Sequence, residues 1–280
     1  MVIEKKLNII IFGSTGSIGS FLLKKYFKKK HNLLVFLKDK KKLNILKKKY
    51  QSEGTQTIKF EILDFNKFQE IKTKLKKNSN FIKKTNLIIS TIGIQGEIKN
   101  FFNLNLEKFY NTFKINFFSQ VLLLKNIYQF IKNNSDTLIV LFSGGGVTGR
   151  RPNFSPYILS KIALVKLVEI LSFELKNKNL RINAISPGII DSKMTRLILR
   201  KSKKDVDLSE LKKIKKEIVN SKKSLEKVYD LINLLIEKKG KKLSGKIISS
   251  RWDRFNYWKN KEFKRLMTHD IYTLRRNQKI

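Results

Sequence analysis

Tyr157 and Lys161, four residues apart, form the pair with the most obvious chemistry in this sequence. Residues at this spacing share one face of a helix. The ammonium group would favour the phenolate and lower the tyrosine pKa from about 10, so that the phenol could serve as a general acid or base. The spacing alone says little, because 8 Tyr and 51 Lys in 280 residues give about 1.5 such pairs by chance and the chain contains five.

A glycine-rich turn follows the first strand-like segment and contains Gly13, Ser14, Thr15, Gly16, Ser17, Ile18 and Gly19. Glycines permit a tight turn and let backbone amides approach a pyrophosphate, while the N-terminus of the next helix offers unpaired N–H donors. Such a turn alone could be an ordinary loop. Its position between the first strand and the first helix indicates a dinucleotide-binding site.

Residues after the next three strands would complete this site. Lys38 at the end of the second strand favours NADP(H), because a cation there accepts a 2′-phosphate, whereas the adjacent Asp39 keeps NAD(H) open. After the third strand, Asp64 and Phe65 would place a carboxylate near the adenine, or Asp64 would cap a helix. Small residues follow the fourth strand, where the nicotinamide ribose needs close backbone approach: Ser90, Thr91, Ile92 and Gly93.

The surroundings of Tyr157 distinguish it from the other four tyrosines with a lysine at this spacing. Only this pair follows a predicted strand that ends at Ser143 and precedes one that ends near Pro187. In an open parallel sheet, ligands bind beyond the carboxyl ends of the strands. Ser143 and Tyr157 are therefore expected to meet beside the nicotinamide, and the other four pairs are interpreted as solvated helix faces.

The alternation of short apolar runs with longer mixed segments predicts an α/β fold. We expect a Rossmann-like, doubly wound sheet of about seven mostly parallel strands between two helical layers, with strands at 7–12, 32–37, 57–63, 86–90, 137–142, 181–186 and 246–250. Residues 1–280 are expected to form a single domain. It would carry a helical substrate flap at about 192–240 and an aromatic, basic tail at 251–280 that packs on the body or on a partner subunit.

Composition excludes several classes of function. With no cysteine, the chain has neither disulfides nor thiolate nucleophiles, and its two histidines, His31 and His269, lie far apart, so no metal site and no Ser-His-Asp triad is expected. No signal-like segment and no apolar run of about 18 residues occurs, so a cytoplasmic protein without a membrane span is expected. The net charge of +39 comes mainly from dispersed lysines, which predicts adhesion to polyanions but no specific nucleic-acid recognition.

The ordered set of motifs resembles the short-chain dehydrogenase/reductase family from about Leu7 to Met194. The resemblance implies that Tyr157 is the general acid or base and that Lys161 binds the nicotinamide ribose and tunes the tyrosine. It also implies that Ser143 holds the substrate oxygen and that Asn116 supports a proton relay. Pro187, Gly188 and Ile190 would complete the cofactor contacts. It also implies interconversion of a carbonyl and a secondary alcohol, and a homodimer or homotetramer formed through the helices that contain Asn116 and Tyr157.

The sequence departs from the family pattern in three places. The turn with Gly16 and Ser17 is also similar to that of nucleotide-sugar epimerases and dehydratases, which remain an alternative. The residues from Ser90 to Gly93 replace the usual Asn-Asn-Ala-Gly. Ser143 precedes Tyr157 by 14 residues, whereas the commonest family spacing would put Gly144 in the place of the serine. From a different class of function, a redox-sensing or scaffolding module that binds NADP(H) without turnover is a second alternative.

Overall fold

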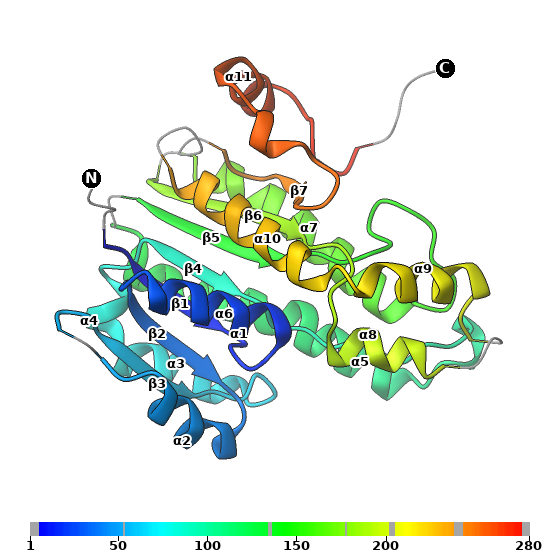
Figure 1. The fold of residues 1–280 in the computed structure, drawn as a ribbon, viewed down its shortest axis with the longest axis horizontal. Helices are drawn as coiled ribbons and strands as arrows, with labels where there is room; N and C mark the ends of the chain where they lie inside the picture. Colours follow the sequence, from blue (N-terminus) through cyan, green and yellow to red (C-terminus); the bar gives the residue numbers. More distant parts are fainter. Residues whose placement is uncertain are drawn as a thin grey trace.

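The computed structural model describes residues 6–52, 54–133, 136–176, 178–201, 205–237 and 243–275. Its centre is one seven-stranded sheet in the order β3-β2-β1-β4-β5-β6-β7, with every neighbouring pair parallel (Figure 1). The strands are β1 (Asn8–Phe12), β2 (Asn32–Leu37), β3 (Ile58–Ile62), β4 (Leu87–Ser90), β5 (Thr137–Phe142), β6 (Leu180–Ser186) and β7 (Ile247–Ser249). The predicted doubly wound fold is confirmed, and the expected strands agree with the observed ones to within one residue at each end.

Strand order reverses at β1, because the chain builds β2 and β3 on one side of it and then crosses to β4 on the other. Such a switch point leaves a crevice at the carboxyl ends of the two central strands, where α/β proteins bind their ligands. Side chains alternate across the sheet, so that Ile9 and Ile11 face one apolar core while Ile10 and Phe12 face the other.

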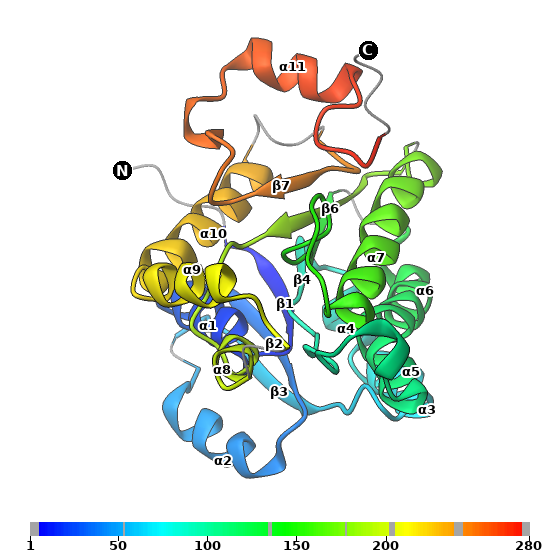
Figure 2. The same ribbon diagram turned by 90° about the vertical axis from the view of Figure 1, so that its right-hand side faces the viewer.

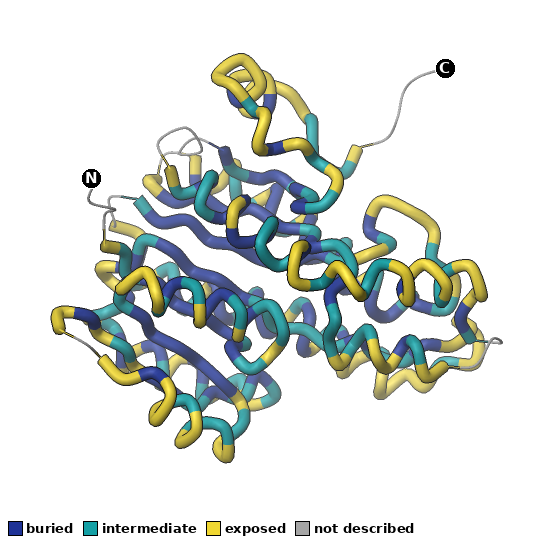
Figure 3. Tube along the Cα trace, in the orientation of Figure 1, coloured by how far each residue is buried: buried dark blue, intermediate teal, exposed yellow. Residues whose placement is uncertain are grey.

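Helices cover both faces of the sheet (Figure 2). One layer contains α1 (Ser17–Lys28), α2 (Lys40–Lys49) and α10 (Ser221–Ile236). The other contains α3 (Phe68–Lys77), α4 (Ser79–Ile82), α6 (Ser119–Ile131) and α7 (Ser155–Glu174). The strands form the buried centre, whereas exposed residues gather on the outer helix faces (Figure 3).

Other helical segments extend past the sheet on the side where the strands end. Beyond the carboxyl ends of the strands are η1 (Phe101–Asn103), α5 (Leu106–Phe113), the π-helical turn η2 (Lys114–Phe118), α8 (Lys193–Leu199) and α9 (Leu208–Ile218). Helices α8 and α9 contribute to a small third core of Ile98, Phe154, Ile198, Val206 and Ile214.

The segment expected to form a flap, 192–240, has two structural parts, and its residues 202–204 and 238–240 lie outside the described residues. Helix α10 belongs to the layer on the sheet, because Val228, Leu231, Ile232 and Leu235 are fully buried there. Helix α10 therefore does not fit the expected flap, because its apolar face, which the sequence interpretation overlooked, packs on the sheet. A flap formed by the part before α10 stays a prediction.

The tail after β7 leaves the sheet, forms η3 (Phe255–Tyr257) and α11 (Asn260–Thr268), and then returns. On its return the Ile247 amide donates a hydrogen bond to the Tyr272 carbonyl at 2.8 Å, and the Tyr272 ring stacks on Trp258. The Arg275 guanidinium forms ion pairs with Glu169 of α7 and with Asp270. The described part of the tail therefore packs on the body, one of the two alternatives expected, while 276–280 lie outside the described residues.

Candidate active site

A cavity of about 2010 Å³ opens beyond the carboxyl ends of the strands. Every strand contributes to its wall at or just after its last residue, through Gly13, Lys38, Asp64, Thr91, Ser143, Pro187 and Ser249. Most of the residues singled out in the sequence line it: Gly13, Thr15, Gly16, Ser17, Ile18, Lys38, Asp39, Asp64, Phe65, Thr91, Ile92, Gly93, Ser143, Tyr157, Lys161, Pro187, Gly188 and Ile190. Four that were expected at the site do not line it: Ser14, Gly19, Ser90 and Asn116.

The glycine-rich turn is built by close backbone contacts. Gly13 has a φ of +82°, and a Cβ atom there would lie 2.6 Å from the Thr91 hydroxyl oxygen, while a Cβ atom on Gly19 would lie 2.4 Å from the Gly13 carbonyl oxygen. Ser14 is fully buried and bonds to the Phe36 carbonyl, so it holds the turn on β2 instead of facing a ligand.

The N-terminus of α1 faces the cavity without a side-chain cap. Gly16 is the N-cap residue, and Ser17 and Ile18, the first two residues of the helix, line the cavity. Uncapped N–H groups and the positive end of the helix dipole form an anion site. Together with the close approach at Gly13, this arrangement fits a pyrophosphate group.

Two carboxylates just after β2 and β3 are bonded to groups of the protein itself, and their expected contacts with a cofactor stay predictions. Asp39 caps α2 by accepting hydrogen bonds from the Lys41 and Lys42 amides at 2.9 and 3.4 Å. Asp64 does not cap α3, whose N-cap is Lys67. It closes a turn with Asn66 and lies 3.3 Å from the Lys38 ammonium. Partial burial opposes its ionisation, but the bonds from Asn66 and Lys38 hold the pKa of Asp64 below its usual value.

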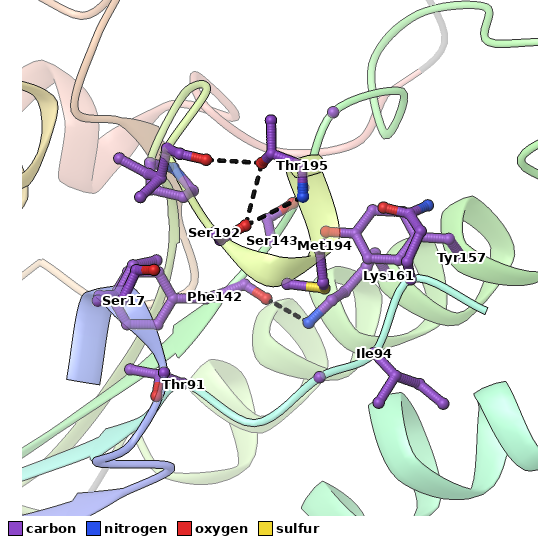
Figure 4. A pocket seen from close by; sticks show the side chains of 18 of the residues that line it. Ser17, Thr91, Ile94, Phe142, Ser143, Tyr157, Lys161, Ser192, Met194 and Thr195 are labelled. Carbon is purple, nitrogen blue, oxygen red and sulfur yellow. Dashed lines mark hydrogen bonds between the residues drawn. The ribbon is translucent and has the colours of Figure 1, made fainter. Parts of the chain in front are cut away.

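Tyr157 and Lys161 lie in the first two turns of α7 and are both buried. The Lys161 ammonium donates a hydrogen bond to the Phe142 carbonyl at 2.9 Å, and Figure 4 shows the Tyr157 hydroxyl directed into the cavity toward Met194. Burial lowers the pKa of Lys161 to about 8. Burial also raises the pKa of Tyr157, with the Arg151 guanidinium opposing it. The expectation that Lys161 lowers the tyrosine pKa is therefore wrong for this structure, because the cation acting on the phenol is Arg151.

Asn116 lies behind the cavity wall, in the π-helical turn η2, and is fully buried. Its side-chain oxygen accepts from the Ile94 amide at 2.8 Å, and its side-chain nitrogen donates to the Ile94 carbonyl and to the Ser160 hydroxyl, each at 3.0 Å. Asn116 therefore joins the loop after β4 to α7. Ser90 is likewise engaged inside the protein, through a 2.8 Å bond to Gln120.

Gly144 leaves room for the phenol of Tyr157. A Cβ atom on Gly144 would lie 2.2 Å from the Tyr157 hydroxyl oxygen, so no side chain fits there while the tyrosine keeps its position. The preceding Ser143 extends the pairing of β5 with β6 through its amide, and its buried hydroxyl has no hydrogen-bond partner in the described part of the chain. The Ser143 hydroxyl therefore belongs to the cavity wall, one residue before Gly144, which holds the position that the commonest family spacing assigns to serine.

Sequence reasoning missed the contacts that α9 makes with two loops of the cavity wall. Glu210 pairs with Arg151 of the loop after β5, at 2.5 Å, and Glu217 pairs with Arg251 after β7. All four residues line the cavity. The two glutamates are seven residues apart, which is about two helical turns, so they share one face of α9. The seven-residue spacing of the two glutamates was a signal available in the sequence. Nothing in the sequence indicated which arginines the two glutamates would contact.

Metal and membrane features are absent from the part of the chain that the structure describes. It contains no group of three or more His, Cys, Asp or Glu side chains that could hold a metal ion. No described helix combines the length and apolar character needed to cross a bilayer. The expected cellular compartment stays a prediction.

Comparison with known proteins identifies the family. Residues 7–203 match a family model described as short chain dehydrogenase, so the chain belongs to this family. Human dehydrogenase/reductase SDR family member 4 is 25% identical over 130 residues, which are 46% of this chain and 47% of that protein. The chain thus spans about half the length of the first curated relatives that it matches.

Solved structures support the same fold. A short-chain dehydrogenase/reductase from Saccharomyces cerevisiae superimposes with a TM-score of 0.76 at 19% identity, covering 90% of this chain and 98% of its own. The protein ElxO, solved with NADP bound, gives a TM-score of 0.70 at 18% identity and covers 88% and 97%. The family recognised from the motifs is confirmed.

Proposed function

We propose that this protein interconverts a carbonyl compound and a secondary alcohol by hydride transfer with a nicotinamide cofactor. The observation that carries the proposal is the placement of Tyr157, its hydroxyl directed into a cavity that also receives the glycine-rich turn and the uncapped N-terminus of α1. Buried acid–base groups in a cleft of this kind are candidates for catalysis.

A bound nicotinamide would supply the hydride that adds to the carbonyl carbon. Tyr157 would give its proton to the carbonyl oxygen as charge builds there, and take it back in the reverse reaction. Ser143 would donate a hydrogen bond to the same oxygen, because its hydroxyl has no partner in the described protein. Lys161, with a pKa of about 8, would hold the ribose and keep the tyrosine supplied with protons. Asn116 would support the proton relay indirectly, because its side chain holds the loop after β4 in place.

We infer that the cofactor is NADP(H) in preference to NAD(H). Lys38 and Lys42 line the adenosine end of the cavity, where cations favour a 2′-phosphate. The carboxylate of Asp39, which would favour the ribose hydroxyls of NAD(H), is engaged in capping α2. That ElxO binds NADP is consistent with this choice.

The test compares Tyr157→Phe with a control tyrosine of the same spacing. Tyr157→Phe removes the proton donor, so turnover of aldehydes and ketones with NADPH should fall by about 100-fold or more while NADPH binding, followed by fluorescence, is retained. Tyr257→Phe is the matched control, because Tyr257 precedes Lys261 by the same four residues but is 78% exposed. An unchanged rate in Tyr157→Phe contradicts the proposal.

A second candidate function is a sensor or scaffold that binds NADP(H) without turnover. The observation that favours it is Gly144, which occupies the position where the commonest family spacing places serine. Tight NADPH binding with no activity over a broad panel of aldehydes, ketones and alcohols would support this candidate. A nucleotide-sugar epimerase or dehydratase, the other alternative, returns the hydride to its bound cofactor in each turnover. Such an enzyme would instead purify with its nicotinamide cofactor still bound.

We also propose that the protein forms a homodimer or homotetramer through the faces of α5, α6 and α7. Large apolar residues are exposed on α7 at Leu159, Ile170 and Phe173, and these positions share one stripe of the helix. Exposed apolar surface of this kind marks contacts between proteins. Size-exclusion chromatography with light scattering should give the mass of a dimer or tetramer, and Phe173→Glu should lower it.

Helices α8 and α9 are proposed as the substrate flap. They border the cavity through residues such as Met194, Ile198, Glu210 and Ile214. Their own core is small, and ion pairs hold α9 to the rest of the wall. Segments with few buried contacts open at low cost, so these helices could admit substrate without disturbing the sheet.

A further inference from the structure

Arg151, in the loop between β5 and α7, is held from two sides. Its guanidinium pairs with the Glu210 carboxylate of α9 at 2.5 Å, and its central carbon, Cζ, lies 3.7 Å from the centre of the Phe154 ring. Phe154 is itself fixed, because it is 1% exposed in the small core that it shares with α8 and α9. An ion pair and a cation–π contact together leave the guanidinium little freedom to move. Glu210 and Phe154 are called the Arg151 clamp below.

The glycines after β5 bring this guanidinium close to the phenol of Tyr157. A Cβ atom on Gly145 would lie 3.9 Å from the Nη1 atom of Arg151, and one on Gly144 would lie 2.2 Å from the Tyr157 hydroxyl oxygen. The guanidinium and the phenol therefore pack against neighbouring residues, whose Cα atoms are about 3.8 Å apart. The Glu210 carboxylate lies on the other edge of the guanidinium, because it contacts the Nε and Nη2 atoms. Nη1 is thus the part of Arg151 nearest to the phenol.

A positive charge in this position favours the ionised form of the phenol. Burial raises the pKa of Tyr157, and the Arg151 guanidinium opposes this rise. The Arg151 side chain is only 12% exposed, so water and salt screen its field weakly. Lys161, the buried cation on the same helix as Tyr157, directs its ammonium to the Phe142 carbonyl at 2.9 Å. Arg151 therefore has the position that the sequence interpretation gave to Lys161.

The cavity wall also receives charged groups from α8, α9 and the segments after β5, β6 and β7. Two other arginines are paired with carboxylates, Arg251 with Glu217 and Arg196 with Asp191. The other charged groups of these elements are Asp253, whose carboxylate accepts from a backbone amide, and three exposed cations, Arg150, Lys193 and Lys213. Water screens the exposed charges. Arg151 differs from these groups because it is nearly buried and packs on the glycine next to Gly144.

We propose that Arg151 is a positioning residue for catalysis: its clamp holds a positive charge beside the Tyr157 phenol and thereby assists transfer of the phenolic proton. The proposal rests on the reductase function above. In reduction, the charge stabilises the phenolate that remains after Tyr157 gives its proton to the carbonyl oxygen. In oxidation, it favours the phenolate that takes the proton of the alcohol. Because Glu210 belongs to α9, the proposed flap, the charge is held in place only while α9 lies against this loop.

The first test follows the Tyr157 phenol directly in the cofactor-free protein. Phenolate absorbance is titrated from pH 8 to 11, and the titration of the matching Tyr157→Phe protein is subtracted so that one phenol remains. Arg151→Met, which keeps an apolar contact with Phe154, should move the Tyr157 transition to higher pH or out of this range. Arg151→Lys, which keeps the charge, should leave it closer to that of the unchanged protein.

Arg254→Met is the control for net charge, because Arg254 is exposed and does not line the cavity. It should leave the Tyr157 transition in place. A transition that Arg151→Met does not move, or that Arg254→Met moves as far, would overturn the proposal. Absence of any Tyr157 transition in the unchanged protein would overturn it as well, since the phenol would then not be assisted.

The clamp is tested without any change of charge. Glu210→Asp shortens the carboxylate arm by one methylene group, which draws the guanidinium away from the phenol or releases it. The Tyr157 transition should move in the same direction as in Arg151→Met, but less far. Glu217→Asp makes the same change in the other ion pair of α9 and should leave the transition in place. No movement in Glu210→Asp, or equal movement in both variants, would overturn the role of the clamp.

Kinetics separate this proposal from the reductase function. With NADP⁺ and the secondary alcohols of the panel at pH 7, Arg151→Met has less phenolate, so kcat should fall about 10-fold. Arg151→Lys should restore kcat to within about 3-fold of the unchanged protein, whereas lysine cannot replace an arginine that only holds the loop through its planar fork. Failure of lysine to restore the rate therefore counts against the proposal. If the unchanged protein oxidises no alcohol of the panel, the reductase function fails, and the absorbance titration alone decides about Arg151.

Discussion

Replacing Lys161 by methionine should stabilise the protein while abolishing its activity. Lys161 is buried, and its pKa falls from an ordinary value of 10.5 to about 8 in the folded chain. At pH 7 the fold therefore holds an ammonium group that it disfavours relative to water by about 3 kcal/mol. Lys161→Met removes that cost but also removes the hydrogen bond to the Phe142 carbonyl, worth about 1 kcal/mol. The net expectation at pH 7 is a gain of about 2 kcal/mol.

The dependence of this gain on pH identifies its cause. Below pH 8 the lysine is charged in both the folded and the unfolded chain, so the full cost is present. As pH rises from 8 toward 10.5, the folded protein gives up this proton before the unfolded chain does, and its stability increases. At pH 9.5 this should have recovered about 2 kcal/mol, so the advantage of Lys161→Met should be almost gone.

Urea denaturation of the cofactor-free proteins at pH 7 and 9.5, followed by circular dichroism, measures both values. All other titrating groups are common to the two proteins and cancel in the difference. A variant that is less stable than the unchanged protein by the same margin at both pH values would refute the reasoning, because burial of the charge could then not be what lowers the stability.

Three other perturbations follow from contacts in the site. Gly144→Ala should lower kcat/KM by about 10-fold or more, because the new methyl group would meet the Tyr157 hydroxyl at 2.2 Å, whereas Gly149→Ala meets nothing within 4 Å and serves as the control; equal activities would contradict the steric argument. Lys38→Ala should raise the KM for NADPH by about 10-fold with little effect on NADH, as measured by initial rates, and equal effects on both would argue against a 2′-phosphate contact. The double substitution Glu210→Gln and Glu217→Gln removes both ion pairs of α9 and should accelerate tryptic cleavage within 208–218 a few-fold, as followed by mass spectrometry, since each of these partly buried pairs contributes on the order of 1 kcal/mol; an unchanged rate would show that these pairs do not hold the flap closed.

The sequence by itself determined the architecture and the place of the site. Apolar runs of strand length alternating with helical segments specify parallel βαβ units, because strand and helix periodicities are local properties of the chain. The turn from Gly13 to Gly19 was recognisable for the same reason, whereas the pair of Tyr157 and Lys161 was recognisable from the predicted strands that precede and follow it. Together with strand order, these residues locate the cavity at the carboxyl ends of the strands.

Only the tertiary structure decided what each side chain contacts. Whether Asp39 or Asp64 caps a helix depends on where each helix begins, and the partner of Lys161 depends on how α7 packs against the end of β5. The lack of space beside Gly144 depends on the packing of α7, and the place of the Arg151 guanidinium on its contacts with Phe154 and with Glu210 of α9. Distances and burial arise from contacts between segments far apart in the chain, and they set pKa values and free hydrogen-bonding groups, which no local pattern encodes.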